Sequence, residues 1–300
     1  MQRTTLFGHQ MALAILLIAG CESGSSTPYA GSAESTSDGY GNGVPSAPAA
    51  AGGAALPAVT SVALTSSGAF QNFLADGMGR PLYVFANDVP GTSTSACTGA
   101  CLDKWPVWDA KELSAGAGLT ASDFTRFQRP DGSWQTAFKG RPLYRFATDA
   151  AGSVSGDGVG GRWYVARDYL AFLAAKLDVT PQGAAMPAPF MTNRTGRTVY
   201  VFMNDTAGAP PTSACIDKCL DAWPVWNAPA SLDAMVLPSS MKASDFGSFE
   251  RTIAGQTVKQ LTYRGFPLYF HSTDTEPGAT TGHMTGAWRV IDPTAFTGAK

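Results

Sequence analysis

A short motif, Tyr-x-aromatic-x-x-Asp, occurs at four places and constrains the fold of this chain more than any other feature. Each copy has its aspartate five residues after its tyrosine. The copies are Tyr83, Phe85 and Asp88; Tyr144, Phe146 and Asp149; Tyr200, Phe202 and Asp205; and Tyr269, His271 and Asp274. Residues two apart lie on one face of a strand, so the motif predicts a buried strand face that ends in a turn. We therefore expect a repeat protein.

Features around the motif repeat as well, and they match copy one to copy three and copy two to copy four. A Cys-x-x-x-Cys pair and a Trp-Pro-Val-Trp segment follow the first and third copies. Their residues are Cys97, Cys101, Trp105 and Trp108, then Cys215, Cys219, Trp223 and Trp226. Matching positions lie 117 to 125 residues apart. This offset predicts two homologous repeat domains, 58–178 and 179–300, each built from two half-repeats.

Composition and turn signals predict a mainly β fold of two tandem small domains, rich in hairpins and meanders. The chain has 33 glycines and 20 prolines among 300 residues, and long helical periodicity is scarce. In the first domain the expected elements are a hairpin of 70–74 with 82–85, a meander of 124–129, 134–138 and 143–146, a strand at 163–165 and a short closing helix at 169–177.

The N-terminus has the pattern of a lipoprotein leader. Arg3 precedes an apolar run, 11–19, which is too short to span a membrane, and Ile18-Ala-Gly-Cys21 fits a lipobox. We expect a signal peptide over 1–20, a lipid on Cys21 and a disordered Gly, Ser, Ala and Pro tether up to residue 57. Glu22, where aspartate would favour inner-membrane retention, predicts the outer membrane of a Gram-negative cell. The alternative is an ordinary secretory signal.

The net charge of −2 gives no basic excess to neutralise phosphates, so nucleic acid is not an expected partner. The expected partners are the membrane, through the lipid anchor, and an envelope protein or glycan.

Two interpretations of the cysteine pairs stay open. In an exported protein, Cys97 with Cys101 and Cys215 with Cys219 predict two local disulfides. The same spacing is used by copper sites, which need a third ligand such as histidine. The first domain has no histidine. Disulfides are therefore the first expectation, and redox-active or copper-binding thiols are the alternative.

In the second domain, His271, His283, Met284 and Met203 are candidates for a soft metal site. Their residue types alone motivate this hypothesis, and no cofactor is otherwise expected.

The motif aspartates and the tryptophans each allow a structural and a functional interpretation. An Asx-turn explains the aspartates, and calcium binding is the alternative. Trp105, Trp108, Trp223 and Trp226 either pack over the cysteine pairs or form an exposed platform for a sugar or a protein.

Catalytic signatures are missing from the sequence. It contains no nucleophile elbow, no His-Glu-x-x-His pattern, no phosphate-binding glycine loop and no haem-attachment motif. No catalytic residue can therefore be named, and we expect a protein that is not an enzyme.

The motif, the cysteine spacing and the Trp-Pro segments resemble the secreted-repeat lipoproteins, a bacterial family of undetermined molecular function. The resemblance covers about residues 60–295 and the lipobox, and it departs at His271, where an aromatic is expected. It implies an exported, lipid-anchored protein and assigns no catalytic residue. The expected function is a non-enzymatic binding or interaction module at the cell envelope, and the alternative is a redox or copper-handling lipoprotein.

Overall fold

The computed structural model describes residues 59–92, 94–174 and 189–298. The predicted signal peptide, Cys21 and the tether lie outside these residues. Residues Ala54–Lys300 form one compact unit. Within it, we call 58–178 the first segment and 179–300 the second segment, and their separation into two domains stays a prediction.

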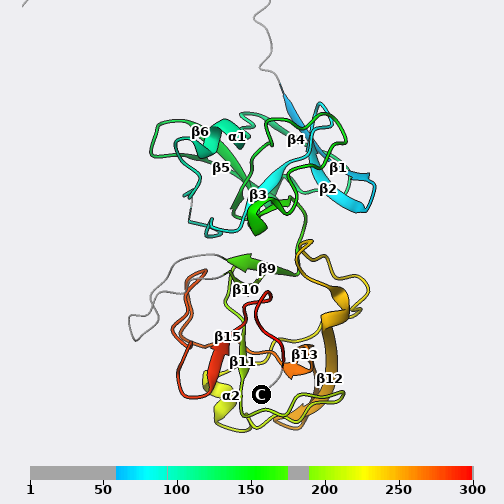
Figure 1. The fold of residues 1–300 in the computed structure, drawn as a ribbon, viewed down its shortest axis with the longest axis vertical. Helices are drawn as coiled ribbons and strands as arrows, with labels where there is room; N and C mark the ends of the chain where they lie inside the picture. The colour runs from blue at the N-terminus through cyan, green and yellow to red at the C-terminus, as the bar shows by residue number, and fades with distance from the viewer. Residues whose placement is uncertain (1–58, 93, 175–188, 299–300) are drawn as a thin grey trace, which may run out of the picture. The chain divides into compact units, whose positions relative to one another are not determined.

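The first segment is built from small sheets, as a mainly β fold requires (Figure 1). One sheet has the order β2-β1-β4, with β4 parallel to β1; β3 pairs with β8, and β5-β6-β7 form a meander. The strands are β1 (Thr60–Ser67), β2 (Phe70–Asp76), β3 (Tyr83–Phe85), β4 (Leu113–Ala115), β5 (Phe124–Gln128), β6 (Trp134–Phe138), β7 (Arg141–Pro142) and β8 (Trp163–Val165).

The second segment repeats two of these three sheets. Strand β11 pairs with β15 as β3 pairs with β8, and β12-β13-β14 form the second meander. The strands are β10 (Phe190–Asn193), β11 (Tyr200–Phe202), β12 (Phe246–Ile253), β13 (Gln256–Tyr263), β14 (Phe266–Pro267) and β15 (Trp288–Val290). The β12 and β13 hairpin has eight residues in each strand, against five in β5 and β6.

The helices are short. Helices α1 (Cys101–Lys104) and α2 (Cys219–Ala222) begin at the second cysteine of each pair, and 3₁₀ turns lie at Ala121–Asp123, Val159–Gly161 and Ala243–Asp245. In the described ranges, no helix has the length and apolar character to cross a membrane.

Three expected elements differ from the structure. The expected 70–74 and 82–85 hairpin is wrong along most of its length, because β2 pairs with β1 and β3 with β8; β2 meets the chain before β3 only at a bridge between Ala75 and Pro81. The third meander strand is shorter than expected and lies at Arg141–Pro142.

The expected closing helix is also wrong. Residues Ala171–Ala174 form strand β9, which pairs antiparallel with β10 and is buried along its whole length. Local propensity does not determine whether this apolar run forms a helix or a strand. Its pairing with β10 and its burial determine that it is a strand.

Candidate functional site

In the first segment, the motif strands of the two half-repeats meet at their tyrosines. The backbone N–H of Tyr83 donates to the carbonyl of Tyr144 at 2.8 Å, and the N–H of Tyr144 donates back at 3.0 Å. The side chains then cross: the Tyr144 hydroxyl donates to Asp88 at 2.7 Å, and the Tyr83 hydroxyl donates to Asp149. Each half-repeat therefore supplies the acceptor for the tyrosine of the other.

The second segment contains the same exchange. Tyr200 and Tyr269 share two backbone hydrogen bonds of 2.9 and 3.0 Å. The Tyr269 hydroxyl donates to Asp205 at 2.8 Å and the Tyr200 hydroxyl donates to Asp274 at 2.6 Å. All four motif tyrosines are buried, so each hydroxyl needs a partner and finds it in the other half-repeat. The motif thus specifies how two half-repeats pair.

The motif aspartates also hold the loops that follow them. The second oxygen of Asp88 accepts the N–H of Ala96 at 2.7 Å, and that of Asp205 accepts the N–H of Ala214 at 2.7 Å. The matching donors for the other two aspartates are the N–H groups of Ser155 and Thr281. These donors lie six to nine residues downstream, whereas an Asx-turn closes over two. The Asx-turn expectation is therefore wrong in its span, although it correctly placed a carboxylate under backbone donors.

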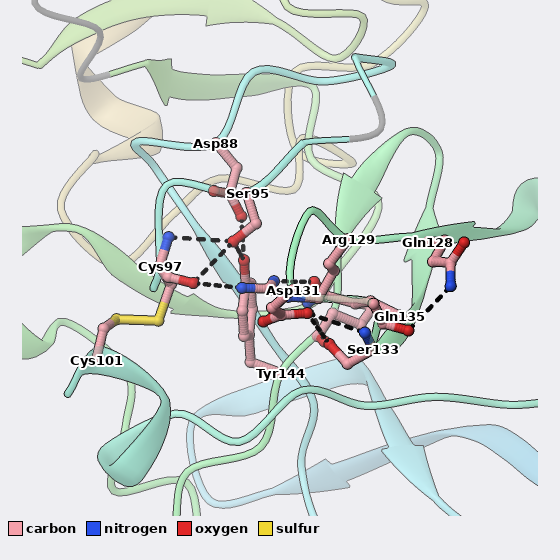
Figure 2. A network of polar contacts seen from close by, with 12 residues as sticks. Asp88, Ser95, Cys97, Cys101, Gln128, Arg129, Asp131, Ser133, Gln135 and Tyr144 are labelled. Carbon is pink, nitrogen blue, oxygen red and sulfur yellow. Dashed lines mark hydrogen bonds and ion pairs between the residues drawn. A yellow bond between two sulfur atoms is a disulfide. The ribbon is translucent and has the colours of Figure 1, made fainter. Parts of the chain in front are cut away.

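The cysteine pairs are disulfides, Cys97 to Cys101 and Cys215 to Cys219, each with a separation of four residues. A buried arginine fixes the first loop from the meander: Arg129 donates to the carbonyl of Cys97 at 2.6 Å and to the amide oxygen of Gln135 at 2.5 Å (Figure 2). Arg251 does the same in the second segment, donating to the carbonyl of Cys215 at 2.7 Å. Each loop is therefore tied to the interior of its segment at its first cysteine.

This network contains a carboxyl group with an unusual environment. Burial raises the pKa of Asp88 to about 7, against the lowering effect of the Tyr144 hydroxyl, the Ala96 N–H and the charges of Arg129 and Arg141. Burial also lowers the pKa of Arg141 to about 9. Asp88 binds Tyr144 and Ala96, and Arg129 binds Gln135 and the carbonyl of Cys97, so these bonds position strands and loops. Nη2 of Arg141 is buried without a hydrogen-bond partner among the described residues.

The tryptophans of the two Trp-Pro-Val-Trp segments are buried. Their exposed fractions are 3% for Trp105, 0% for Trp108, 6% for Trp223 and 7% for Trp226. The hypothesis that these four rings form an exposed platform is therefore wrong. Trp105 and Trp223 share a core cluster with Cys97 and Cys215, respectively, as the packing interpretation expects, whereas Trp108 and Trp226 belong to the largest core cluster, which contains no cysteine.

Trp105 belongs to a four-ring stack in the first segment. Its ring stacks on Trp163 with centroids 3.8 Å apart, Trp163 stacks on Phe85 at 4.1 Å, and Phe146 lies against the other side of Trp105 at 4.6 Å. Stacked aromatic rings bury large areas and fix one another in place. The stack also passes beside the tyrosines, because Tyr83 and Tyr144 meet it edge-on.

The second segment has the same stack with one change at its end. Phe202, Trp288 and Trp223 stack at 4.3 and 3.7 Å, and His271 replaces the last phenylalanine at 4.2 Å from Trp223. Nδ1 of His271 lies 2.9 Å from the hydroxyl of Thr273. Burial lowers the pKa of His271, which disfavours the protonated ring.

The candidate metal ligands of the second segment are only partly brought together. His283 and Met203 line one hollow, whereas His271 belongs to the aromatic stack and Met284 is exposed. Nδ1 of His283 accepts the N–H of Val290 at 3.1 Å, so Nδ1 is not available to a metal and the ring proton is on Nε2. Over the residues that the structure describes, no three His, Cys, Asp or Glu side chains are grouped to hold a metal ion.

A different tryptophan is exposed. Trp134, at the start of β6, has an exposed fraction of 42%, and the guanidinium of Arg126 lies 4.2 Å from its ring. Asp109 holds that guanidinium through two bonds of 2.6 and 2.7 Å. Sequence reasoning missed Trp134, although a signal was present: it is the one tryptophan with no counterpart in the second segment.

Three parts of the chain, residues 72–108, 125–167 and 189–226, match the family model described as a secreted repeat of unknown function. They contain the first three motif copies, and the copy with His271 lies outside them. The chain matches no curated protein and no solved structure. The matches cover three of the four motif copies whose tyrosines and aspartates form the crossed pairs. The chain therefore carries three copies of this secreted repeat, and the description of the repeat supports export.

Proposed function

We propose that this protein is a lipid-anchored, non-enzymatic binding module of the cell envelope, and that its contact face lies on the β5 and β6 hairpin. The observation that carries the proposal is the Trp134 ring, which is exposed beside a fixed guanidinium and carboxylate. The other six tryptophans are buried. The ion pair that holds this exposed ring in place supports its role as a contact surface.

The chemistry of this face favours a carbohydrate. An aromatic face is electron-rich and attracts the polarised C–H groups of a sugar ring. Asp109, Arg126 and Gln128 supply planar donors and acceptors for hydroxyl groups, and Gln128 lies directly opposite Trp134 in the hairpin. Because Arg126 and Asp109 neutralise each other, the face suits an uncharged glycan better than a charged one.

A protein partner fits this face less well. A stable protein interface needs about 800 Å² on each side with an apolar centre. Among the described residues, the other large exposed apolar side chains are Val59, Leu64, Met78, Ile216 and Met284, and none of them belongs to this hairpin.

The redox or copper-handling alternative needs free thiolates. Both cysteine pairs are oxidised, and Cys97 and Cys215 are buried. A free-thiol assay on protein purified from the envelope tests this alternative: thiols that titrate, or copper in elemental analysis, would favour it over glycan binding.

The anchor is part of the proposal. A lipid on Cys21 and the tether that follows would hold the module at the outer membrane of a Gram-negative cell. A tether of roughly 36 residues has an end-to-end distance of about 30 to 35 Å, enough to clear the headgroups.

The test is a glycan array probed with the full chain in lipid nanodiscs. We expect binding to neutral oligosaccharides, and a loss of about tenfold in affinity for Trp134→Ala. Met78→Ala, which removes an exposed apolar side chain outside the hairpin, is the matched control and should bind normally. Equal binding by Trp134→Ala and the parent chain would refute this contact face.

A further inference from the structure

The second segment contains a hollow that lies outside the proposed contact face. It has a volume of about 330 Å³ and is lined by Met203, His283, Arg289, Val290, Asp292 and Phe296, among others. Its size is at the lower end of the range of small-molecule sites. The lining combines apolar side chains with one arginine, one histidine and one aspartate.

The hollow lies where the two segments differ. In β8, Tyr164 pairs with Val84; in β15, Arg289 pairs with Val201 and so occupies the equivalent position. Tyr164 is buried, donates to the carbonyl of Gly161 at 2.8 Å and packs edge-on against Phe172. The first segment thus fills this position with a tyrosine ring, and the second segment places a cation there.

Arg289 brings a positive charge to this hollow. Its Nη1 donates to the carbonyls of Gly286 and Trp288, and within the described residues Arg289 forms no ion pair. Oδ1 of Asp292, which also lines the hollow, accepts the N–H and the hydroxyl of Thr294 and so stabilises the turn at 292–294. Nε and Nη2 of Arg289 remain for a ligand.

His283 adds a neutral donor. Because Nδ1 accepts the N–H of Val290, the ring proton is on Nε2. Burial and the neighbouring charge of Arg289 both lower the pKa of His283, which keeps the ring uncharged. Nε2–H is therefore the polar group that His283 can offer to a ligand.

We propose that this hollow binds a small organic anion, a carboxylate carried on a short apolar chain or ring. The carboxylate would pair with Arg289 and accept from Nε2 of His283, and the apolar body would pack on Met203, Val290 and Phe296. Arginine is suited to this role because its planar donors match a carboxylate. The site is separate from the Trp134 face, so either proposal can fail alone.

The test uses ligand-observed saturation-transfer NMR on the full chain in lipid nanodiscs, with empty nanodiscs as the blank. The probes are hexanoate and hexan-1-ol, which share the apolar chain and differ in charge. We expect saturation transfer to hexanoate, at least tenfold weaker binding of hexan-1-ol, and a similar loss of hexanoate binding in Arg289→Gln.

Two further variants at position 289 separate the effect of its charge from an effect on folding. Arg289→Tyr installs the residue of the first segment and should abolish binding with an unchanged melting temperature. Arg289→Lys keeps the charge and should retain part of the affinity. Equal binding of the two probes, or undiminished hexanoate binding in Arg289→Gln, would overturn the proposal.

Discussion

The two segments share their interior almost residue for residue, and they differ at a few defined places. The shared part is the crossed tyrosine and aspartate pairs, the arginine on the cysteine carbonyl and the aromatic stack. The differences include the longer β12 and β13 hairpin, the end of the stack, the position of Tyr164 and Arg289, and the exposed Trp134. We infer that the repeated residues specify folding and that the residues without a counterpart are available for recognition.

The largest expected effect is the stability lost when a ring is removed from either aromatic stack, and it shows whether the two stacks stabilise their segments equally. Trp105→Ala and Trp223→Ala each remove the ring at the centre of a stack and leave a cavity, so each should lower the free energy of unfolding by about 3 to 5 kcal/mol. Denaturant unfolding measures this. A cost below about 1 kcal/mol in one segment alone would break the equivalence.

A smaller effect is expected from the crossed hydrogen bonds. Tyr144→Phe and Tyr269→Phe remove one donor from a buried aspartate, which should cost about 1 to 3 kcal/mol each. Tyr164→Phe is the control, because it breaks only one bond to a carbonyl and should cost about 1 kcal/mol. If all three variants lose the same stability, the crossed pairs have no special role.

Asp88 predicts a pH dependence in the first segment. The folded form keeps the Asp88 proton up to about pH 7, whereas the unfolded chain loses it near pH 4. The unfolded state therefore binds fewer protons in this window, and stability falls as the pH rises through it, by at most about 1.4 kcal/mol for each pH unit.

Urea unfolding of the parent chain and Asp88→Asn across pH 4 to 8 checks this. The free energy of unfolding should fall less steeply with rising pH in Asp88→Asn than in the parent chain. An identical pH profile would show that Asp88 is ionised throughout the window.

The smallest effect concerns the end of the second stack. Burial lowers the pKa of His271, so the unfolded chain takes up this proton first and stability is lost as the pH falls below about 6.5. His271→Phe copies the first segment and should lose this part of the acid sensitivity. Thermal melts at pH 5 and pH 7.5 measure the difference; unchanged acid sensitivity would contradict the assignment.

Much of the fold could be predicted because each repeat carries its strand, turn and cysteine signals within a short stretch of sequence. The alternation in Tyr83-Val-Phe85 and the turn after it predicted strands correctly, and the cysteine spacing predicted the disulfides. The strand at Ala171–Ala174 could not be predicted, because a short apolar run fits a strand or a buried helix equally well and only its pairing with β10 decides between them.

The candidate site was predicted less well for a physical reason. Repetition draws attention to residues such as Trp105, whose recurrence reflects packing, while Trp134 and Arg289 are single. The partner of each motif tyrosine also lies 56 to 74 residues away, so the crossed pairs need the structure to be seen. A comparison of the two segments for what does not recur would have found Trp134.

The central claim is that the repeated residues fold the protein and that Trp134 binds its partner. The most direct measurement compares Trp134→Ala with Tyr83→Phe for both melting temperature and glycan binding in the full chain. We predict that Trp134→Ala keeps its melting temperature and loses binding, while Tyr83→Phe melts lower and still binds when folded. Loss of binding in a folded Tyr83→Phe chain, with binding intact in Trp134→Ala, would contradict the account.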